Sequence, residues 1–243
     1  MSNPKPHASL FGELGEAILD LVYPPRCLVC GTLGRHVLCP ACIQGFHPVK
    51  SPICQNCGRP RARGEKCPDC THAPARYITQ ARAPWIFDGT LREAVHALKY
   101  RRKRRLAQPL GQTLADFLLT KPFPSVVFDA VVPVPLHPKR LRQRGFNQSA
   151  LLAKEVAQAL NLPVAEVLIR TRATRTQVTL HVSERAANVV GAFAVPVPGD
   201  VEGRTLLLVD DVVTTLRTAD ECARVLREAG CAAVYVASLA RDL

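Results

Sequence analysis

The stretch from Leu206 to Thr218 constrains the fold more than any other part of the chain. Four apolar residues, Leu206 to Val209, run directly into two adjacent carboxylates, Asp210 and Asp211. An apolar run without polar alternation is typical of a strand that is buried on both faces of a parallel sheet. A short loop of hydroxyl residues follows, and then an amphipathic helix that we expect to end before Gly230.

A second apolar run, residues 232–239, follows this helix and is expected to form the next strand. The three elements would make a βαβ unit, with polar groups at the carboxyl end of its first strand, where open α/β sheets bind ligands. The loop 214–218 opens the helix, so its free amides and the positive end of the helix dipole suit a phosphate group. The alternative is a buried strand whose acid pair caps the next helix.

This pattern resembles the phosphoribosyl-pyrophosphate (PRPP) motif of type I phosphoribosyltransferases, in which a Thr-Thr-x-x-Thr loop follows an acidic pair and two apolar residues. The resemblance implies an α/β fold of that type, a Rossmann-like and mostly parallel sheet flanked by helices. It also implies that Asp210 and Asp211 are the catalytic pair that holds the ribose hydroxyls, and that Mg²⁺ binds with PRPP. The implied contacts to the ribose 5-phosphate come from Val213, Thr214, Thr215, Leu216, Arg217 and Thr218.

Leu216 departs from this pattern, because the family usually has glycine at its position. Glycine tolerates positive φ and lets the backbone approach a ligand closely. We expect the Leu216 side chain to point away from the phosphate. This residue weighs against tight PRPP binding and turnover, whereas the intact acid pair weighs in favour of them.

Composition limits the class of partner. The 243 residues suffice for one medium domain and an appendage. A net charge of +12 favours anionic partners, such as phosphorylated small molecules or nucleic acid. The longest apolar runs have the length of strands, so we expect no integral membrane span. Acidic residues interrupt the first apolar segment, 10–22, unlike a signal peptide, and we expect a cytoplasmic protein.

Eight of the ten cysteines form four Cys-x2-Cys pairs, which predict two structural zinc ions. Tetrahedral zinc takes four thiolates, a Cys-x2-Cys turn presents two of them, and a complete set leaves no position open for catalysis. A cytoplasmic chain favours metal binding over disulfides. The simplest pairing is sequential, although an interleaved pairing is also possible. The sequential sets are Cys27, Cys30, Cys39 and Cys42, then Cys54, Cys57, Cys67 and Cys70. The nearby His36, His47 and His72 are interpreted as surface residues.

The remaining pattern alternates strands and helices. It predicts a tail and helix over 1–23, a double zinc ribbon over 24–75 and a phosphoribosyltransferase-like domain over 76–243. In the last domain we expect strands over 81–87, 129–135 and 189–195, the first at a sheet edge because it contains Pro84. Helices are expected from Leu91, over 106–119, and up to Asn161.

Six of the seven residues 99–105 are cationic, and Tyr100 lies among them. They suit a contact with an anion or nucleic acid in which Tyr100 stacks on a base. A solvated basic helix end, favoured by the helix dipole, explains the same pattern and is the preferred interpretation.

Two further segments carry a more specific resemblance. Residues 132–137 are Val-Pro-Val-Pro-Leu-His, basic residues follow, and residues 144–148 are Arg-Gly-Phe-Asn-Gln. Together with the cysteine pairs, they resemble the ComF family, whose members join an N-terminal cysteine-rich zinc domain to a phosphoribosyltransferase-like domain. Type I phosphoribosyltransferases contact pyrophosphate in the loop that here spans about 135–144, and they carry a mobile lid that here falls within 168–188. The implied pyrophosphate contacts are Lys139, Arg140, Arg142 and Arg144, and the implied lid contacts are Arg172, Arg175, Gln177 and Arg185.

Two functions follow from these resemblances. The first is transfer of a phosphoribosyl group from PRPP, with release of pyrophosphate, to an acceptor that the sequence does not identify. The second is a non-catalytic or weakly catalytic role in single-stranded DNA uptake, with DNA and DNA-uptake proteins as partners. The net charge of +12 suits either function.

Overall fold

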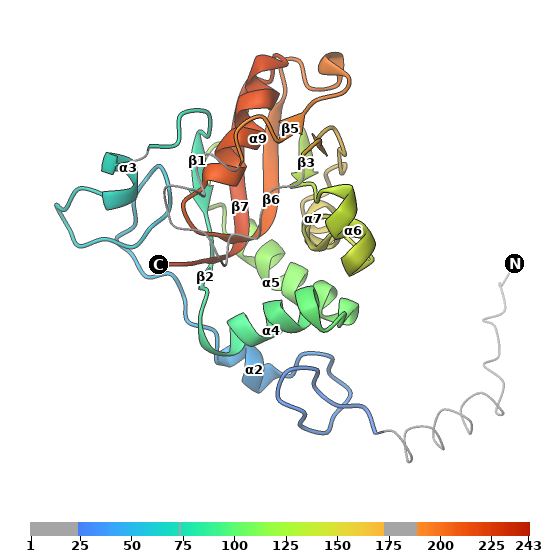
Figure 1. Cartoon of the computed structure of the whole chain (residues 1–243). Coiled ribbons are helices and arrows are strands. Elements are labelled where there is room, and N and C mark those ends of the chain that lie inside the picture. Colours follow the sequence, from blue (N-terminus) through green and yellow to red (C-terminus); the bar gives the residue numbers. More distant parts are fainter. Residues whose placement is uncertain (1–23, 73, 173–188) are drawn as a thin grey trace, which may run out of the picture.

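The computed structural model describes residues 24–72, 74–172 and 189–243 (Figure 1). A parallel sheet lies at the centre, and helices cover both of its faces. The first cysteine-containing segment lies next to α4, and the second lies next to β1 (Figure 1). The expected helix over 10–22 lies outside the described residues. Within the described residues, no helix has the length and apolar character needed to cross a membrane.

The central sheet has the strand order β1-β7-β6-β3, and β2 also pairs with β7. All of these pairings are parallel. The strands are β1 (Gln80–Arg82), β2 (Trp85–Ile86), β3 (Ala130–Pro133), β6 (Thr205–Val213) and β7 (Ala233–Arg241). The strand expected over 81–87 is divided into β1 and β2 at Pro84, because proline has no N–H for the ladder. Its predicted place at a sheet edge is confirmed, since β1 ends the strand order.

Two hydrophobic clusters cover the two faces of the sheet. Along β6, Leu207 and Val209 face the cluster that contains α4, α5 and α7. Leu206 and Leu208 face the cluster that contains α9. All four side chains are fully buried, as expected for a strand with an apolar residue at every position. The helices are α4 (Gly89–Tyr100), α5 (Ala107–Leu119), α6 (Pro138–Arg144), α7 (Gln148–Leu160) and α9 (Arg217–Glu228).

The predicted βαβ unit is present as β6, α9 and β7. The helix ends before Gly230, whose φ of +92° is the left-handed conformation that follows many helix C-termini. The first strand is longer than expected, because β6 continues through the acid pair. Val212 pairs with Ala240, and Val213 pairs with Arg241. The two carboxylates therefore lie within the strand, before its last two residues.

Two other expectations need correction. The segment expected to be a loop over 135–144 contains α6, because Pro138 occupies its first turn and His137 Nδ1 accepts from the Lys139 amide at 3.1 Å. The strand expected over 189–195 is reduced to β5 (Phe193–Ala194). It pairs antiparallel with β4 (Ile169–Arg170), away from the central sheet.

Short elements complete the described chain. The cysteine-rich segments contain only the five-residue helices α2 (Pro40–Gln44) and α3 (Pro68–His72). Two 3-10 turns, η1 (Arg104–Leu106) and η3 (Pro198–Asp200), lie in connecting segments. The cysteine-rich segments thus have little regular backbone structure of their own.

Candidate functional site

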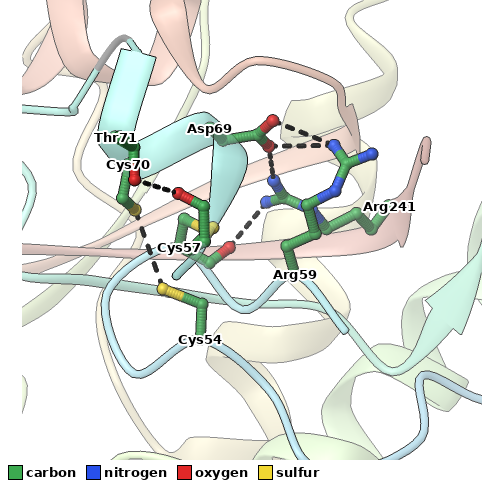
Figure 2. Close-up of polar contacts among 8 residues, drawn as sticks. Cys54, Cys57, Arg59, Asp69, Cys70, Thr71 and Arg241 are labelled. Carbon is green, nitrogen blue, oxygen red and sulfur yellow. Dashed lines mark hydrogen bonds and ion pairs between the residues drawn. The ribbon is translucent and has the colours of Figure 1, made fainter. Parts of the chain in front are cut away.

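Eight cysteines form two groups in which all four sulfur atoms lie within 4.8 Å of one another. The structure brings together the sequential sets and not interleaved ones. In the first set, the Sγ atoms of Cys27 and Cys42 are 3.7 Å apart, and those of Cys30 and Cys39 are 3.6 Å apart. In the second set, the Sγ atoms of Cys54 and Cys70 are 3.7 Å apart (Figure 2). Those of Cys57 and Cys67 are 3.4 Å apart.

These distances fit zinc. Four thiolates at a Zn–S distance of about 2.3 Å would place the sulfur atoms about 3.8 Å apart. In each group, the first Cys-x2-Cys turn is followed by a glycine with positive φ, +77° at Gly31 and +73° at Gly58. Residues with an L side chain rarely adopt this backbone conformation. The groups found among the described residues contain no histidine, as expected. His47 instead lies 2.8 Å from an Asp88 carboxylate oxygen.

A cavity of about 290 Å³ lies at the carboxyl ends of β3 and β6. This is the edge at which open α/β sheets bind ligands. Its walls come from the end of β6, the loop before α9, the segment after β3, and the C-terminal end of α4. The cavity is lined by, among others, Lys99, Tyr100, Arg140, Arg144, Ser149, Arg170, Asp210, Asp211, Val213 to Thr218, and Asp242.

The acid pair is held in place by hydrogen bonds. Asp210 Oδ1 accepts from Ser149 Oγ at 2.8 Å and from the Asp211 amide at 2.9 Å. Asp211 Oδ1 accepts from the Val212 amide at 2.7 Å. Ser149 sits in the first turn of α7, which Asn147 caps by accepting from the Ser149 amide at 3.1 Å. The carboxylates are thus oriented before any ligand arrives.

Lys99 is a site residue that the sequence interpretation missed. Its Nζ lies 2.8 Å from Asp211 Oδ2, with side-chain exposures of 17% for the lysine and 5% for the aspartate. The preferred interpretation of residues 99–105 as a solvated helix end is therefore wrong for Lys99. The interpretation as solvated residues is correct for residues 101–105, whose side chains are exposed. Lys99 neutralises one carboxylate of the pair from the C-terminal end of α4.

The proposed phosphate loop, residues 214–218, lines the cavity and leads into α9. Leu216 has φ +59° and ψ 0°, the left-handed conformation that favours glycine. Its side chain is 5% exposed and packs in the cluster beneath α9, away from the solvent side of the loop. Leucine therefore adopts the backbone shape of glycine here, and burial of its side chain offsets the strain.

Substitution of Leu216 tests this balance. Leu216→Gly will lower the free energy of unfolding by about 2 kcal/mol, because losing a buried leucine costs about 2–5 kcal/mol and relief of the left-handed strain returns about 1–2. Leu216→Ala keeps the strain and loses most of the side chain, so it will be less stable than the glycine variant. Urea denaturation measures both. A glycine variant more stable than the wild type, or less stable than the alanine variant, would contradict this account.

The structure places only two of the four predicted pyrophosphate contacts at the cavity. Arg140 and Arg144 line the cavity, whereas Lys139 and Arg142 are exposed on α6 and do not. Arg144 Nη1 donates a hydrogen bond to Gln148 Oε1, and the Arg144 guanidinium lies 5.7 Å from the centre of the Tyr100 ring. Burial lowers its pKa, although the charge on Asp211 opposes that shift.

The predicted lid residues are only partly described. Arg172 is exposed and donates to the Val190 carbonyl at 2.7 Å, outside the cavity. Arg175, Gln177 and Arg185 lie outside the described residues. Arg170, which the sequence interpretation omitted, is buried in the cavity wall 5.1 Å from the centre of the Phe193 ring.

Asp210 gives the fold a pH dependence. Burial, reinforced by the neighbouring Asp211 carboxylate, raises the pKa of Asp210 to about 7, against about 3.9 in an unfolded chain. The folded state holds this proton more tightly, so its contribution to stability is complete below about pH 4 and is lost as the pH rises through about 7. From about pH 6 to about pH 8, the wild type will therefore lose stability relative to Asp210→Asn in urea denaturation. A stability difference between the wild type and Asp210→Asn that stays constant with pH would contradict the assignment.

Comparison with known proteins agrees with this arrangement. Residues 18–71 match the family model described as a double zinc ribbon domain, and residues 147–243 match that of the phosphoribosyl transferase domain. The DNA utilization protein YhgH of Escherichia coli (strain K12) is 33% identical over 236 residues, which are 92% of this chain and 100% of that protein. Competence protein ComFC of Bacillus subtilis (strain 168) is 28% identical over 203 residues, covering 81% of this chain and 80% of that protein.

Among solved structures, the glutamine PRPP amidotransferase from B. subtilis, complexed with ADP and GMP, is 27% identical with a TM-score of 0.37. The match covers 55% of this chain and 26% of that one, so this chain spans about a quarter of that protein's length.

The sheet, the cavity at its carboxyl edge and the two four-cysteine groups define the class, a phosphoribosyltransferase-type α/β protein with a double zinc ribbon. The predicted fold is thereby confirmed. The near full-length relatives narrow this class further: the chain belongs to the ComF family of competence and DNA-utilization proteins.

Proposed function

We propose that the cavity binds PRPP, or a related ribose 5-phosphate, and transfers its phosphoribosyl group to an acceptor with release of pyrophosphate. One observation carries this proposal: two adjacent carboxylates and the N-terminal loop of α9 line the same cavity. Carboxylates accept hydrogen bonds from a vicinal diol, and helix amides bind a phosphate. A single ligand that carries both groups, a ribose 5-phosphate, would satisfy both features.

Each wall has a role in the proposed reaction. Asp210 and Asp211 accept from the ribose 2- and 3-hydroxyls, and the amides and hydroxyls of residues 214–218 surround the 5-phosphate. Arg217 supports this assignment, because its Nε is buried and has no hydrogen-bond partner within the described part of the chain. The bond from ribose C1 to pyrophosphate breaks as a bond from C1 to the acceptor forms.

The leaving pyrophosphate takes the electron pair of the broken bond and needs cations nearby. Arg140 and Arg144 face the cavity from the segment after β3 and would bind it. The carboxylates of the acid pair suit Mg²⁺, which would neutralise pyrophosphate charge when bound. Lys139 and Arg142 are proposed only as outer, solvent-exposed contacts, and Arg172, Arg175 and Arg185 as contacts of a lid that excludes water.

Calorimetric titration of the zinc-loaded full chain with PRPP and Mg²⁺ tests the proposal. The wild type will release or absorb heat with a saturable isotherm, and the Asp210→Asn/Asp211→Asn double variant will not. Asp116→Asn, an exposed substitution on α5, will bind like the wild type. No heat from the wild type, or the same isotherm from the double variant, would refute ribose phosphate binding at this site.

A specific surface supports a second function, binding of single-stranded DNA. Residues 101–105 are all exposed cations that follow the exposed Tyr100 at the cavity mouth. Arg102 donates to the Gln143 carbonyl at 3.0 Å, which joins this segment to the basic helix α6. Exposed cations track a phosphate backbone, and an exposed aromatic ring stacks on bases. The names of the relatives, DNA utilization and competence proteins, agree with this function.

This second function predicts a steep salt dependence of binding. Affinity for a single-stranded oligonucleotide will fall as salt is raised, and an Arg104→Ser/Arg105→Ser variant will show weaker binding with a shallower slope. Affinity that does not change with salt would count against it. PRPP binding by the same variant will be unchanged, because neither arginine lines the cavity.

A further inference from the structure

The last strand of the sheet makes direct contact with the second cysteine group. The Arg241 side chain at the end of β7 is 1% exposed. Its Nη1 donates to the Cys57 carbonyl at 2.6 Å, and its Nη2 donates to Asp69 Oδ2 at 2.6 Å (Figure 2). Asp69 lies between Cys67 and Cys70 in the sequence. One sheet residue therefore binds both halves of the second group.

The negative charge of a zinc-bound cysteine group would stabilise the buried Arg241 guanidinium, so the contact of Arg241 with this group depends on the metal. A zinc ion held by four thiolates carries a net charge of about −2. Asp69 supplies one negative charge, but it is shared, because Arg59 Nη1 also donates to both of its oxygens at 3.0 Å (Figure 2). A second buried cation of the sheet, Arg82, donates to the Gln55 carbonyl at 2.8 Å. Burying two guanidinium groups here is costly unless negative charge faces them, and a zinc-bound group supplies it.

Arg241 also adjoins the cavity through the backbone. It pairs in register with Val213, the last residue of β6, and the next amide, of Asp242, donates to the Val213 carbonyl at 2.9 Å. Val213 and Asp242 both line the cavity, and the loop 214–218 begins immediately after Val213. A shift of the backbone at Arg241 would therefore move the start of the phosphate loop.

A second connection joins the segment of the second cysteine group to α9. The Asp220 carboxylate, in the first turn of that helix, accepts from three consecutive amides of the chain that leaves the second cysteine group. The amides are those of Arg76, Tyr77 and Ile78, at 3.0, 2.9 and 3.3 Å from Oδ1. Helix α9, whose N-terminus faces the cavity, is thus also bound to the chain that follows the second cysteine group.

We propose that Arg241 is a positioning residue that couples zinc at the second four-cysteine group to the shape of the cavity. Zinc there holds the ends of β6 and β7 in place, and loss of the metal loosens the loop 214–218. Such coupling is reciprocal, so a ligand in the cavity also slows zinc release from this group. The ligand half of this inference rests on the proposed function, whereas the coupling between metal and loop does not.

Arg241→Gln and Arg59→Gln form a matched pair for the test. Each variant loses its ion pair with Asp69, but only Arg241 belongs to the sheet, where it also binds the Cys57 carbonyl. Amide hydrogen exchange of residues 205–218 and 233–243 is measured on zinc-loaded full chain without ligand, and zinc release to a chelator is followed in parallel. Arg241→Gln will speed exchange and the release of one of the two zinc ions by at least about fivefold, and Arg59→Gln will change both by less than about twofold.

Unchanged exchange, or unchanged zinc release, in Arg241→Gln would overturn the coupling, as would equal effects in the two variants. If Arg241→Gln does not fold, Asp69→Asn carries the same prediction, because it removes the charge facing Arg241 without altering the sheet. The dissociation constant for PRPP with Mg²⁺ will also rise at least about fivefold in Arg241→Gln. If the wild type binds no PRPP, the proposed function fails, while exchange and zinc release still decide the coupling.

Discussion

Removal of zinc will abolish the hydrogen-exchange protection of residues 24–72, and about two zinc ions will leave each chain. The reason is that this segment has little regular secondary structure of its own. Its helices, α2 and α3, have five residues each, and its strand pairing consists of isolated bridges such as Arg26 with Leu33. Structural zinc supplies about 10–16 kcal/mol of apparent binding free energy in zinc-finger peptides. Elemental analysis and exchange before and after chelation measure the effect.

Single cysteine substitutions show which cysteine group holds each of the two zinc ions. Cys57→Ser removes a buried thiolate of the second group, so the variant will retain about one zinc ion per chain. Cys231→Ser is the control, because Cys231 Sγ donates to the Arg204 carbonyl at 3.0 Å, lies outside both groups, and serine keeps a donor there. A wild type with one zinc ion, or full protection of residues 24–72 without metal, would contradict two structural sites.

Features encoded by neighbouring residues could be predicted from the sequence. The Cys-x2-Cys spacing places two thiolates on one turn, so the cysteine pairs were apparent without any knowledge of the fold. The apolar run before Asp210, together with Gly230 after the helix, predicted the βαβ unit and thereby the edge of the sheet that carries the cavity. The conformation at Leu216 was also predictable, because glycine, the usual residue at this position in type I phosphoribosyltransferases, tolerates the positive φ that Leu216 has.

Contacts between distant segments could not be predicted in the same way. Lys99 was placed with its exposed cationic neighbours, because nothing in residues 99–105 shows that α4 ends beside the acid pair of β6. Helical spacing held a signal, however: Lys99 lies four residues after Val95, on the face that also buries Leu91. A cation on the buried face of a helix needs a carboxylate partner.

Arg241 and α6 show two other limits. Arg241 is the third residue from the C-terminus, where sequence reasoning expects little, and its partners Cys57 and Asp69 lie far away in the chain. Helix α6 was missed because the prolines and basic residues of 135–144 resemble a loop, although Pro138 suits the first turn of a helix. The decisive information for Arg241 is tertiary, whereas the signal for α6 is local.

Substitution of Lys99 by methionine will lower the free energy of unfolding by about 3 kcal/mol at neutral pH. Methionine preserves the length of the side chain but leaves Asp211 Oδ2 buried without its cation. Breaking a buried ion pair by removing one partner costs about 3–5 kcal/mol, and the 17% exposure of Lys99 places the effect at the lower end. Urea denaturation of the zinc-loaded protein measures the change.

Two further variants separate charge from packing. Arg101→Met, two residues along the chain, removes a cation whose Nη2 lies 3.8 Å from Glu93 Oε2 in an exposed pair, and it will change stability by less than about 0.5 kcal/mol. Lys99→Met/Asp211→Asn will recover much of the loss, because no unpaired charge stays buried, so the two substitutions will be strongly non-additive. Additive effects, or equal effects of Lys99→Met and Arg101→Met, would show that Lys99 does not hold the acid pair. In that case the carboxylates of the site would depend on Ser149 and the strand amides alone.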